Sequence, residues 1–279
     1  MSLRIHGFNT VHMDIVGLEV MLLHSGINAK IPRENLLPPT YREKVVLPNG
    51  MSGEGCSNPA PIWYIEGAKS RILVEAGISE ENVKECNTAF SKYNDPQFYI
   101  KKPEHDINKF LARFNVTPED IDIVILTHLH LDHFANASAY KNATFIVQDE
   151  EIPLALTPPA YGTFDFYYPE FSHHVLSIID KIEAINGDMV IEPGIEVWKL
   201  GGHTPGLMAV AIETKDGLAV LTSDSCLTYK NFEYKWPMGC FFNLKDVLEG
   251  YKRIEKYADI VIPQHDYSFW EKYPNGIVG

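Results

Sequence analysis

Cysteine is scarce in this sequence, with four residues among 279, and the four are widely separated. Scattered cysteines form neither the paired CxxC motif of a zinc knuckle nor a dense disulfide framework, so we expect reduced thiols. No stretch reaches the ~20 consecutive apolar residues that span a bilayer, and Met1 to Asn9 lacks the charged and apolar blocks of a secretory signal. We therefore expect a soluble, cytoplasmic protein.

Basic residues are also few: 24 Lys and Arg stand against 37 Asp and Glu, which gives a formal net charge of -13. A field of this sign repels polyanions, so it counts against a nucleic-acid substrate. We expect a small-molecule substrate, no nucleic-acid partner and no membrane partner. The sequence leaves open whether the chain is a monomer or a homodimer.

Short apolar runs rich in β-branched residues recur along the chain and predict strands. Helical spacing is clearest from Leu244 to Ile254, where the apolar residues share one face. Strands dominate and helices interrupt them, so we expect an α/β protein whose sheets are covered by helices. The predicted strands are residues 16–23, 62–65, 71–74, 121–126, 143–147, 195–200, 208–212 and 218–221.

Two stretches without a sustained period, Ile31 to Ser57 and Thr157 to Phe171, are candidates for long loops. Ordered loops of this length are usually functional. The second stretch is rich in aromatic residues, which would either wall a pocket or form a packed loop or an oligomer contact. These aromatic residues are Tyr161, Phe164, Phe166, Tyr167, Tyr168 and Phe171.

The segment Ile121 to His133 carries the strongest chemical signal, because a buried-strand pattern runs directly into three histidines and an aspartate. Residues two apart in an extended chain point to the same side, so His128 and His130 can aim at one metal ion. If the chain then turns into a helix, Asp132 and His133 can approach a second ion nearby. Imidazole and carboxylate ligands suit a borderline divalent ion.

Further ligands are available downstream, where three more polar residues each follow an apolar strand. His203 lies in a glycine-rich turn, Asp224 could bridge two ions through its two oxygens, and His265 ends another strand. Each alone is more often an ordinary loop residue. Together with the first cluster they form the expected complement of a two-metal site.

These motifs resemble the metallo-β-lactamase superfamily: HxHxDH at residues 128–133, GHTPG around His203, then Asp224 and His265. The resemblance implies a single domain over residues 1–279, folded as a four-layer αβ/βα sandwich with metals at the strand ends. It also implies which residues hold each ion. His128, His130 and His203 would hold the first metal, Asp132, His133 and His265 the second, and Asp224 would bridge them.

Within the superfamily, the segment LTHLHLDH and the run from Asp224 to Glu233 look most like the N-acyl homoserine lactone hydrolases. Those lactonases commonly carry a tyrosine three residues after the bridging aspartate, where this chain has Leu227. Tyr229 or a tyrosine from another loop would then supply the hydroxyl. The family usually has aspartate at the position of Glu75, which would support the site from outside the ligand set.

The mechanism expected from this site is hydrolysis of a small cyclic ester by a hydroxide held between the two ions, which lower the pKa of water. Asp132 is the expected proton shuttle between the attacking water and the leaving oxygen. Zinc is the expected metal, with manganese, iron and cobalt as alternatives.

Three other functions remain open at this point. A phosphodiesterase or nuclease could use the same two ions, although the acidic balance disfavours it. A thioester hydrolase of the glyoxalase type would want basic residues for its anionic substrate, and no such cluster is evident near the C-terminus. A metal-bound binding module is the alternative outside enzymology.

Overall fold

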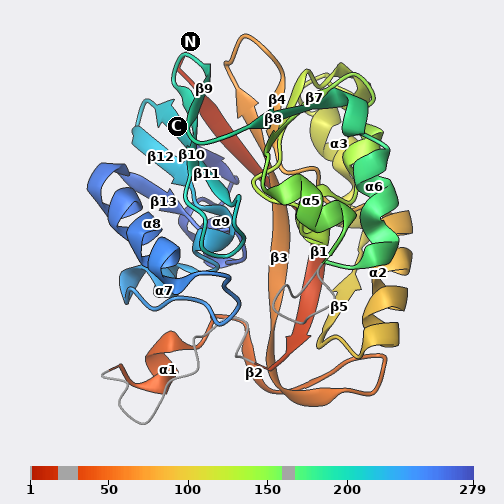
Figure 1. Cartoon of the computed structure of the whole chain (residues 1–279). Helices are drawn as coiled ribbons and strands as arrows, with labels where there is room; N and C mark the ends of the chain where they lie inside the picture. The colour runs from red at the N-terminus through yellow and green to blue at the C-terminus, as the bar shows by residue number, and fades with distance from the viewer. Residues whose placement is uncertain (1, 18–30, 159–166) are drawn as a thin grey trace.

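The computed structural model describes residues 2–17, 31–158 and 167–279, and within them two β-sheets pack face to face with helices on both outer sides (Figure 1). The larger sheet has the order β14-β1-β3-β4-β6-β7-β8, with β2 added beside β3 and β5 beside β1. Its strands are β1 (Arg4–Val16), β2 (Tyr41–Val46), β3 (Ser52–Glu66), β4 (Ile72–Val74), β5 (Gln97–Ile100), β6 (Ile123–Ile125), β7 (Thr144–Gln148), β8 (Ile182–Ile185) and β14 (Ile277–Val278).

The smaller sheet has the order β13-β12-β11-β10-β9. Strands β12 and β13 are parallel, and β11 is antiparallel to both β10 and β12. It follows that β10, β12 and β13 all end at the same edge of this sheet. The strands are β9 (Met189–Glu192), β10 (Ile195–Lys199), β11 (Met208–Thr214), β12 (Gly217–Leu221) and β13 (Ile260–Ile262).

The helices flank the two sheets, with α7 and α8 on one side of the molecule and α2, α3, α5 and α6 on the other (Figure 1). The α-helices are α1 (Arg33–Leu36), α2 (Glu80–Tyr93), α3 (Ile107–Ala112), α4 (Leu131–Phe134), α5 (Glu151–Leu156), α6 (Ser172–Leu176), α7 (Tyr229–Glu233), α8 (Leu244–Tyr257) and α9 (Ser268–Lys272). Short 3₁₀ turns are η1 (Pro103–His105), η2 (Pro118–Asp120), η3 (Ala137–Ala139), η4 (Pro169–Phe171), η5 (Ile179–Lys181) and η6 (Ser223–Ser225).

Successive residues of a strand alternate between the core that separates the two sheets and the face covered by helices, and this alternation gives the four layers. In β6, Ile125 enters the core between the two sheets, while its neighbour Val124 packs on the helix side. In β12, Leu221 enters that same central core and Val220 faces α8. Because successive strand residues point to opposite faces, strands buried on both sides read as continuous apolar runs. The αβ/βα sandwich expected from the sequence is confirmed.

Most predicted elements are present, including α8, which begins at Leu244. The loop expected from Ile31 to Ser57 is wrong in its second half, where β2 and β3 form an antiparallel hairpin. The pairing of β2 with β3 shifts register between Arg42 and Val45, and irregular pairing of this kind carries little periodic signal, which explains the miss. Most of the strand expected at residues 16–23 lies outside the described residues. No helix in the described part of the chain has the length and apolar character needed to cross a bilayer.

Candidate metal centre

The seven predicted ligands converge at one edge of the sandwich, where strands from both sheets end. His128 and His130 follow β6, His203 follows β10, Asp224 follows β12 and His265 follows β13. The remaining two, Asp132 and His133, lie in the short helix α4. Since the strands that precede them run in a common direction within each sheet, residues far apart in sequence arrive at the same place.

Three histidines and one aspartate oxygen form the first group. Nδ1 of His130 lies 3.0 Å from Nε2 of His128 and 3.0 Å from Nε2 of His203. Oδ2 of Asp224 lies 3.3 Å from His203 Nε2 and 3.9 Å from His128 Nε2. All four side chains are buried, so their polar atoms face each other rather than solvent.

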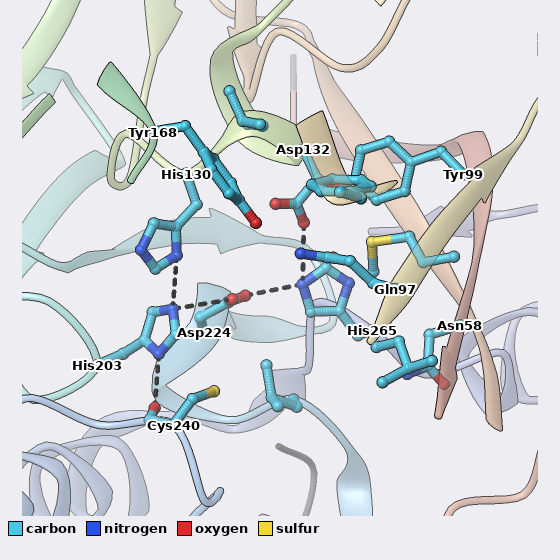
Figure 2. A pocket seen from close by; sticks show the side chains of 15 residues that line it. Asn58, Gln97, Tyr99, His130, Asp132, Tyr168, His203, Asp224, Cys240 and His265 are labelled. Carbon is cyan, nitrogen blue, oxygen red and sulfur yellow. Dashed lines mark hydrogen bonds and ion pairs between the residues drawn. The ribbon is translucent and has the colours of Figure 1, made fainter. Parts of the chain in front are cut away.

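Asp132, His133 and His265 form the second group. Oδ2 of Asp132 lies 3.2 Å from His133 Nε2 and 3.4 Å from His265 Nε2. The other oxygen of Asp224, Oδ1, lies 3.0 Å from His265 Nε2 and 3.5 Å from His133 Nε2. Asp224 therefore presents one oxygen to each group, as Figure 2 shows for His203 and His265.

The hydrogen bonds at Nδ1 of His203 and of His265 indicate that the two ligand groups fit metal ions. Nδ1 of His203 lies 2.8 Å from the carbonyl of Cys240, and Nδ1 of His265 lies 2.7 Å from the carbonyl of Pro59. A carbonyl only accepts, so each Nδ1 carries a proton, and in the neutral form of each ring the Nε2 lone pair faces Asp224. Lone pairs facing carboxylate oxygens repel unless a cation or a second proton lies between them.

Buried atoms without partners support the same conclusion. Asp224 Oδ1 and His133 Nε2 have no hydrogen-bond partner within the described residues, although both are fully enclosed. Buried polar atoms are normally satisfied, and a set of imidazole nitrogens and carboxylate oxygens matches a borderline divalent cation. The residues present thus fit the two-metal arrangement that the sequence predicts.

The electrostatics of the two groups differ. Burial and the neighbouring histidines hold the pKa of His128 and of His130 well below the usual histidine value. Burial opposes protonation of His265 as well, but Asp224 and Asp132 outweigh it and raise its pKa. Burial alone would raise the pKa of Asp224, yet His265 and His133 lower it well below the usual range. Asp224 is therefore a carboxylate, the form that ligates cations.

A second layer of polar contacts positions the ligands. Glu75 is wholly buried, with Oε1 3.1 Å from Nδ1 of His133, and it accepts hydrogen bonds from the hydroxyl and the backbone amide of Thr127. The Thr127 hydroxyl in turn lies 2.6 Å from that of Ser223, next to Asp224. This chain links the ends of β4, β6 and β12.

Glu151 holds two ligand loops together, a role that the sequence analysis missed. Its carboxylate accepts hydrogen bonds from the amide of Leu129 at 3.1 Å, from the amide of Gly206 at 2.8 Å and from the Tyr167 hydroxyl at 2.6 Å. Leu129 lies between His128 and His130, and Gly206 closes the turn that carries His203. A lone glutamate at the start of a helix gives no sequence signal for this role.

A pocket opens beside the two groups, and Asp132, His130, His203, Asp224 and His265 form part of its wall (Figure 2). The rest of the wall is mostly apolar, with amide groups at two positions. Such a mixture of apolar surface and a few polar groups is typical of a small-molecule site. The other lining residues are Met13, Ile15, Asn58, Phe90, Gln97, Tyr99, Leu131, Tyr168, Leu227 and Cys240.

Tyr229, proposed from the sequence to supply a hydroxyl, lies elsewhere. It is not among the described residues that line the pocket; its ring packs at the edge of the core between the sheets, with Lys272 Nζ 3.4 Å from the ring centre. Tyr229 is the first residue of α7, and its ring packs against the core between the sheets instead of the pocket wall. Tyr168 from the other loop lies on the same side of the pocket as His130 and Asp132 (Figure 2).

Only part of the aromatic stretch can be placed. Tyr161, Phe164 and Phe166 lie outside the described residues. Tyr168 lines the pocket, Tyr167 packs edge to face against His130 with ring centroids 4.6 Å apart, and both are buried. The pocket wall and the packed loop considered from the sequence are therefore both present in this segment.

Comparison with known proteins agrees with the motifs. The family model described as Metallo-beta-lactamase superfamily matches residues 58–264. An N-acyl homoserine lactonase from Bacillus cereus is 31% identical over 214 residues, which cover 74% of this chain and 81% of that protein.

Solved structures share the fold across almost the whole chain. A mutant of B. thuringiensis AiiA, solved with N-decanoyl-L-homoserine bound at its active site, aligns with a TM-score of 0.74 and 22% identity, over 98% of this chain and 97% of that one. AidC, described as a dizinc quorum-quenching lactonase, aligns with a TM-score of 0.67 and 13% identity, over 95% of this chain and 88% of that one. The match of the family model over residues 58–264 confirms the resemblance inferred from the motifs: this chain belongs to the metallo-β-lactamase superfamily.

Proposed function

We propose that this chain is a metal-dependent hydrolase that opens a small cyclic ester, and that N-acyl homoserine lactones are its first candidate substrates. The observation that carries the proposal is the placement of Asp224 between two ligand groups, beside a largely apolar pocket. Similarity to the Bacillus cereus lactonase supports the choice of lactones over other esters. We also propose that residues 1–279 act as one domain, because both sheets contribute ligands to one centre.

The proposed ligand sets are those of the sequence analysis: His128, His130 and His203 for one ion, Asp132, His133 and His265 for the other, and Asp224 for both. Divalent ions bound there would supply Lewis acidity, which polarises a carbonyl and makes water acidic near neutral pH. Zinc is the proposed metal, because His and Asp ligands without thiolate suit it, with manganese, iron and cobalt as alternatives.

Asp132 is the proposed proton carrier. Burial would raise its pKa, but His133 and His265 outweigh that effect and lower it, so the side chain is available as a base. It lines the pocket, where it can take a proton from the attacking water and return it to the ring oxygen as the acyl carbon–oxygen bond breaks. The products are a carboxylate and an alcohol.

The apolar part of the wall is proposed to bind the acyl portion of the substrate. Phe90, Leu131 and Leu227 contribute hydrocarbon surface close to the ligand groups. A phosphodiester carries negative charge and would favour basic lining residues, yet none of the described residues that line this pocket is lysine or arginine. The phosphodiesterase alternative is therefore not favoured.

The test is a substrate panel on protein whose metal content has been measured. We expect hydrolysis of acyl homoserine lactones or simpler lactones, release of one acid equivalent per turnover, and loss of activity on chelation. Hydrolysis of phosphodiesters or thioesters without lactones would overturn the proposal. The cytoplasmic location and the choice between monomer and homodimer stay predictions from the sequence.

A further inference from the structure

A third group of metal-ligating side chains lies outside the centre described above. Glu85 of α2 faces two adjacent histidines of α6, His173 and His174. Nε2 of His174 lies 2.9 Å from Oε2 of Glu85, and Nε2 of His173 lies 3.3 Å from Oε1. The carboxylate thus presents one oxygen to each ring, and none of the three is among the described residues that line the catalytic pocket.

Ordinary hydrogen bonding does not satisfy both rings. Neutral His174 can donate Nε2–H to Glu85. Nδ1 of His173, however, lies 2.7 Å from the carbonyl of Glu170, so the proton of a neutral His173 is on Nδ1. Its Nε2 lone pair then faces a carboxylate oxygen, a repulsive arrangement unless a second proton or a cation intervenes.

A second proton on His173 alone would relieve this repulsion, so a cation competes with that proton for the same position, whereas protonation of both rings is unfavourable. The ring centroids of His173 and His174 lie 4.1 Å apart, and two imidazolium charges at that separation repel. His174 is also only 8% exposed, and an imidazolium charge at a buried position is costly. A single divalent cation would balance Glu85 and use both ring lone pairs without charging either ring.

We propose that Glu85, His173 and His174 form a further binding site for a divalent cation of the zinc class, separate from the catalytic pair. One ligand atom from each residue lies within 4.8 Å of the others, which small side-chain movements can convert to metal bonds of about 2.0–2.2 Å. Two imidazoles and one carboxylate leave a fourth position of a tetrahedral ion for water. The His173 side chain is 57% exposed, so this position is open to solvent.

The site would tie together two elements that wall the pocket. Helix α2 also carries Phe90, and α6 follows directly on the segment that carries Tyr168; both side chains line the pocket. Their rings lie 5.9 Å apart. Glu170, in the turn η4 just before α6, already contacts Lys92 of α2 at 3.1 Å, and a cation at Glu85 would add a second link between α2 and this segment. Occupancy of the site would therefore rigidify this wall.

The test compares the bound metal of the full-length chain and its variants after equilibrium dialysis against excess Zn²⁺. We expect wild type to retain about one equivalent more per chain than His173→Ala, His174→Ala or Glu85→Gln. His6→Ala is the matched control, because His6 contacts Glu66 at 3.0 Å but belongs to no ligand group among the described residues. The result is the difference in bound metal between wild type and each variant, so metal held at the catalytic centre contributes equally to both and cancels.

Thermal unfolding with and without Zn²⁺ gives a second reading. Zn²⁺ should raise the melting temperature of wild type and of His6→Ala more than that of His173→Ala, whose exposed side chain can be removed without disturbing the core. Equal metal content in wild type and in all three cluster variants would overturn the proposal, and so would equal stabilisation by Zn²⁺. If only His174→Ala misfolds, His173→Ala and Glu85→Gln still decide the question.

Discussion

Glu75 lies 3.1 Å from His133, Oε1 to Nδ1, and both side chains are completely buried. The carboxylate is held in place by Thr127, and the backbone of Glu75 itself has a positive φ of 66°. A positive φ is unfavourable for a residue with a long side chain, so the surrounding contacts must hold this conformation. Glu75 thereby fixes the ring that presents Nε2 to the second ligand group.

Replacing Glu75 by glutamine should weaken metal binding, because the carboxylate that orients His133 and raises its basicity is lost. We expect affinity to fall by about 10–100-fold, the usual effect of losing such an outer contact. Competition with a chromogenic chelator measures it. Glu66→Gln, which alters the Glu66–His6 pair far from the centre, serves as the control. Unchanged affinity in Glu75→Gln would show that Glu75 only fills space.

Asp132→Asn should reduce turnover far more than stability. The amide keeps the size of the side chain but cannot accept the proton of the attacking water, so we expect kcat to fall by about 10²–10⁴-fold. Turnover should be expressed per bound metal, because Asp132 is also a proposed ligand. Normal kcat with full metal content would refute its role as proton carrier.

Replacing Tyr168 or Tyr229 by phenylalanine should have clearly different effects on kcat/KM. Tyr168 lines the pocket and its hydroxyl donates to Asp95, so Tyr168→Phe removes the contact that positions this part of the wall and should lower kcat/KM for a lactone by about tenfold. The Tyr229 hydroxyl is buried with no hydrogen-bond partner among the described residues, so Tyr229→Phe should change kcat/KM by less than about twofold. The opposite order would restore Tyr229 to the catalytic role expected from the sequence.

His105 should make the fold sensitive to acid. The side chain is 4% exposed, its Nδ1 accepts a hydrogen bond from the Lys102 amide, and burial together with His12 lowers its pKa from 6.5 to about 4. Between those pH values the unfolded chain binds a proton at this side chain and the folded chain does not. Stability is therefore lost as the pH falls through that window, by roughly 3 kcal/mol at most.

Denaturant unfolding at about pH 7 and about pH 5 measures this loss. In His105→Asn the decrease in unfolding free energy between the two pH values should be smaller than in wild type, because asparagine does not titrate. The same decrease in both proteins would assign the acid sensitivity to other groups.

The sequence was sufficient to locate the two groups of proposed ligands, because the residue types that suit a metal and their places after strands are local features. The run from His128 to His133 follows an apolar strand, and His203, Asp224 and His265 each follow another, so strand alternation and turn chemistry pointed to all seven positions. The strands of the two sheets could also be predicted from the sequence, since strands buried on both faces give continuous apolar runs. The prediction of a four-layer sandwich needed the motif resemblance in addition to these runs.

Tertiary structure decided which other residues surround those ligands. Glu151 and Glu85 look like ordinary helix glutamates in sequence, yet one joins two ligand loops and the other meets a pair of histidines from α6. The sequence could not tell which of Tyr229 and Tyr168 lines the pocket. That depends on where α7 begins and on the path that the chain takes after α5. Periodicity records which face of an element is buried, whereas contacts between distant elements depend on how the layers pack.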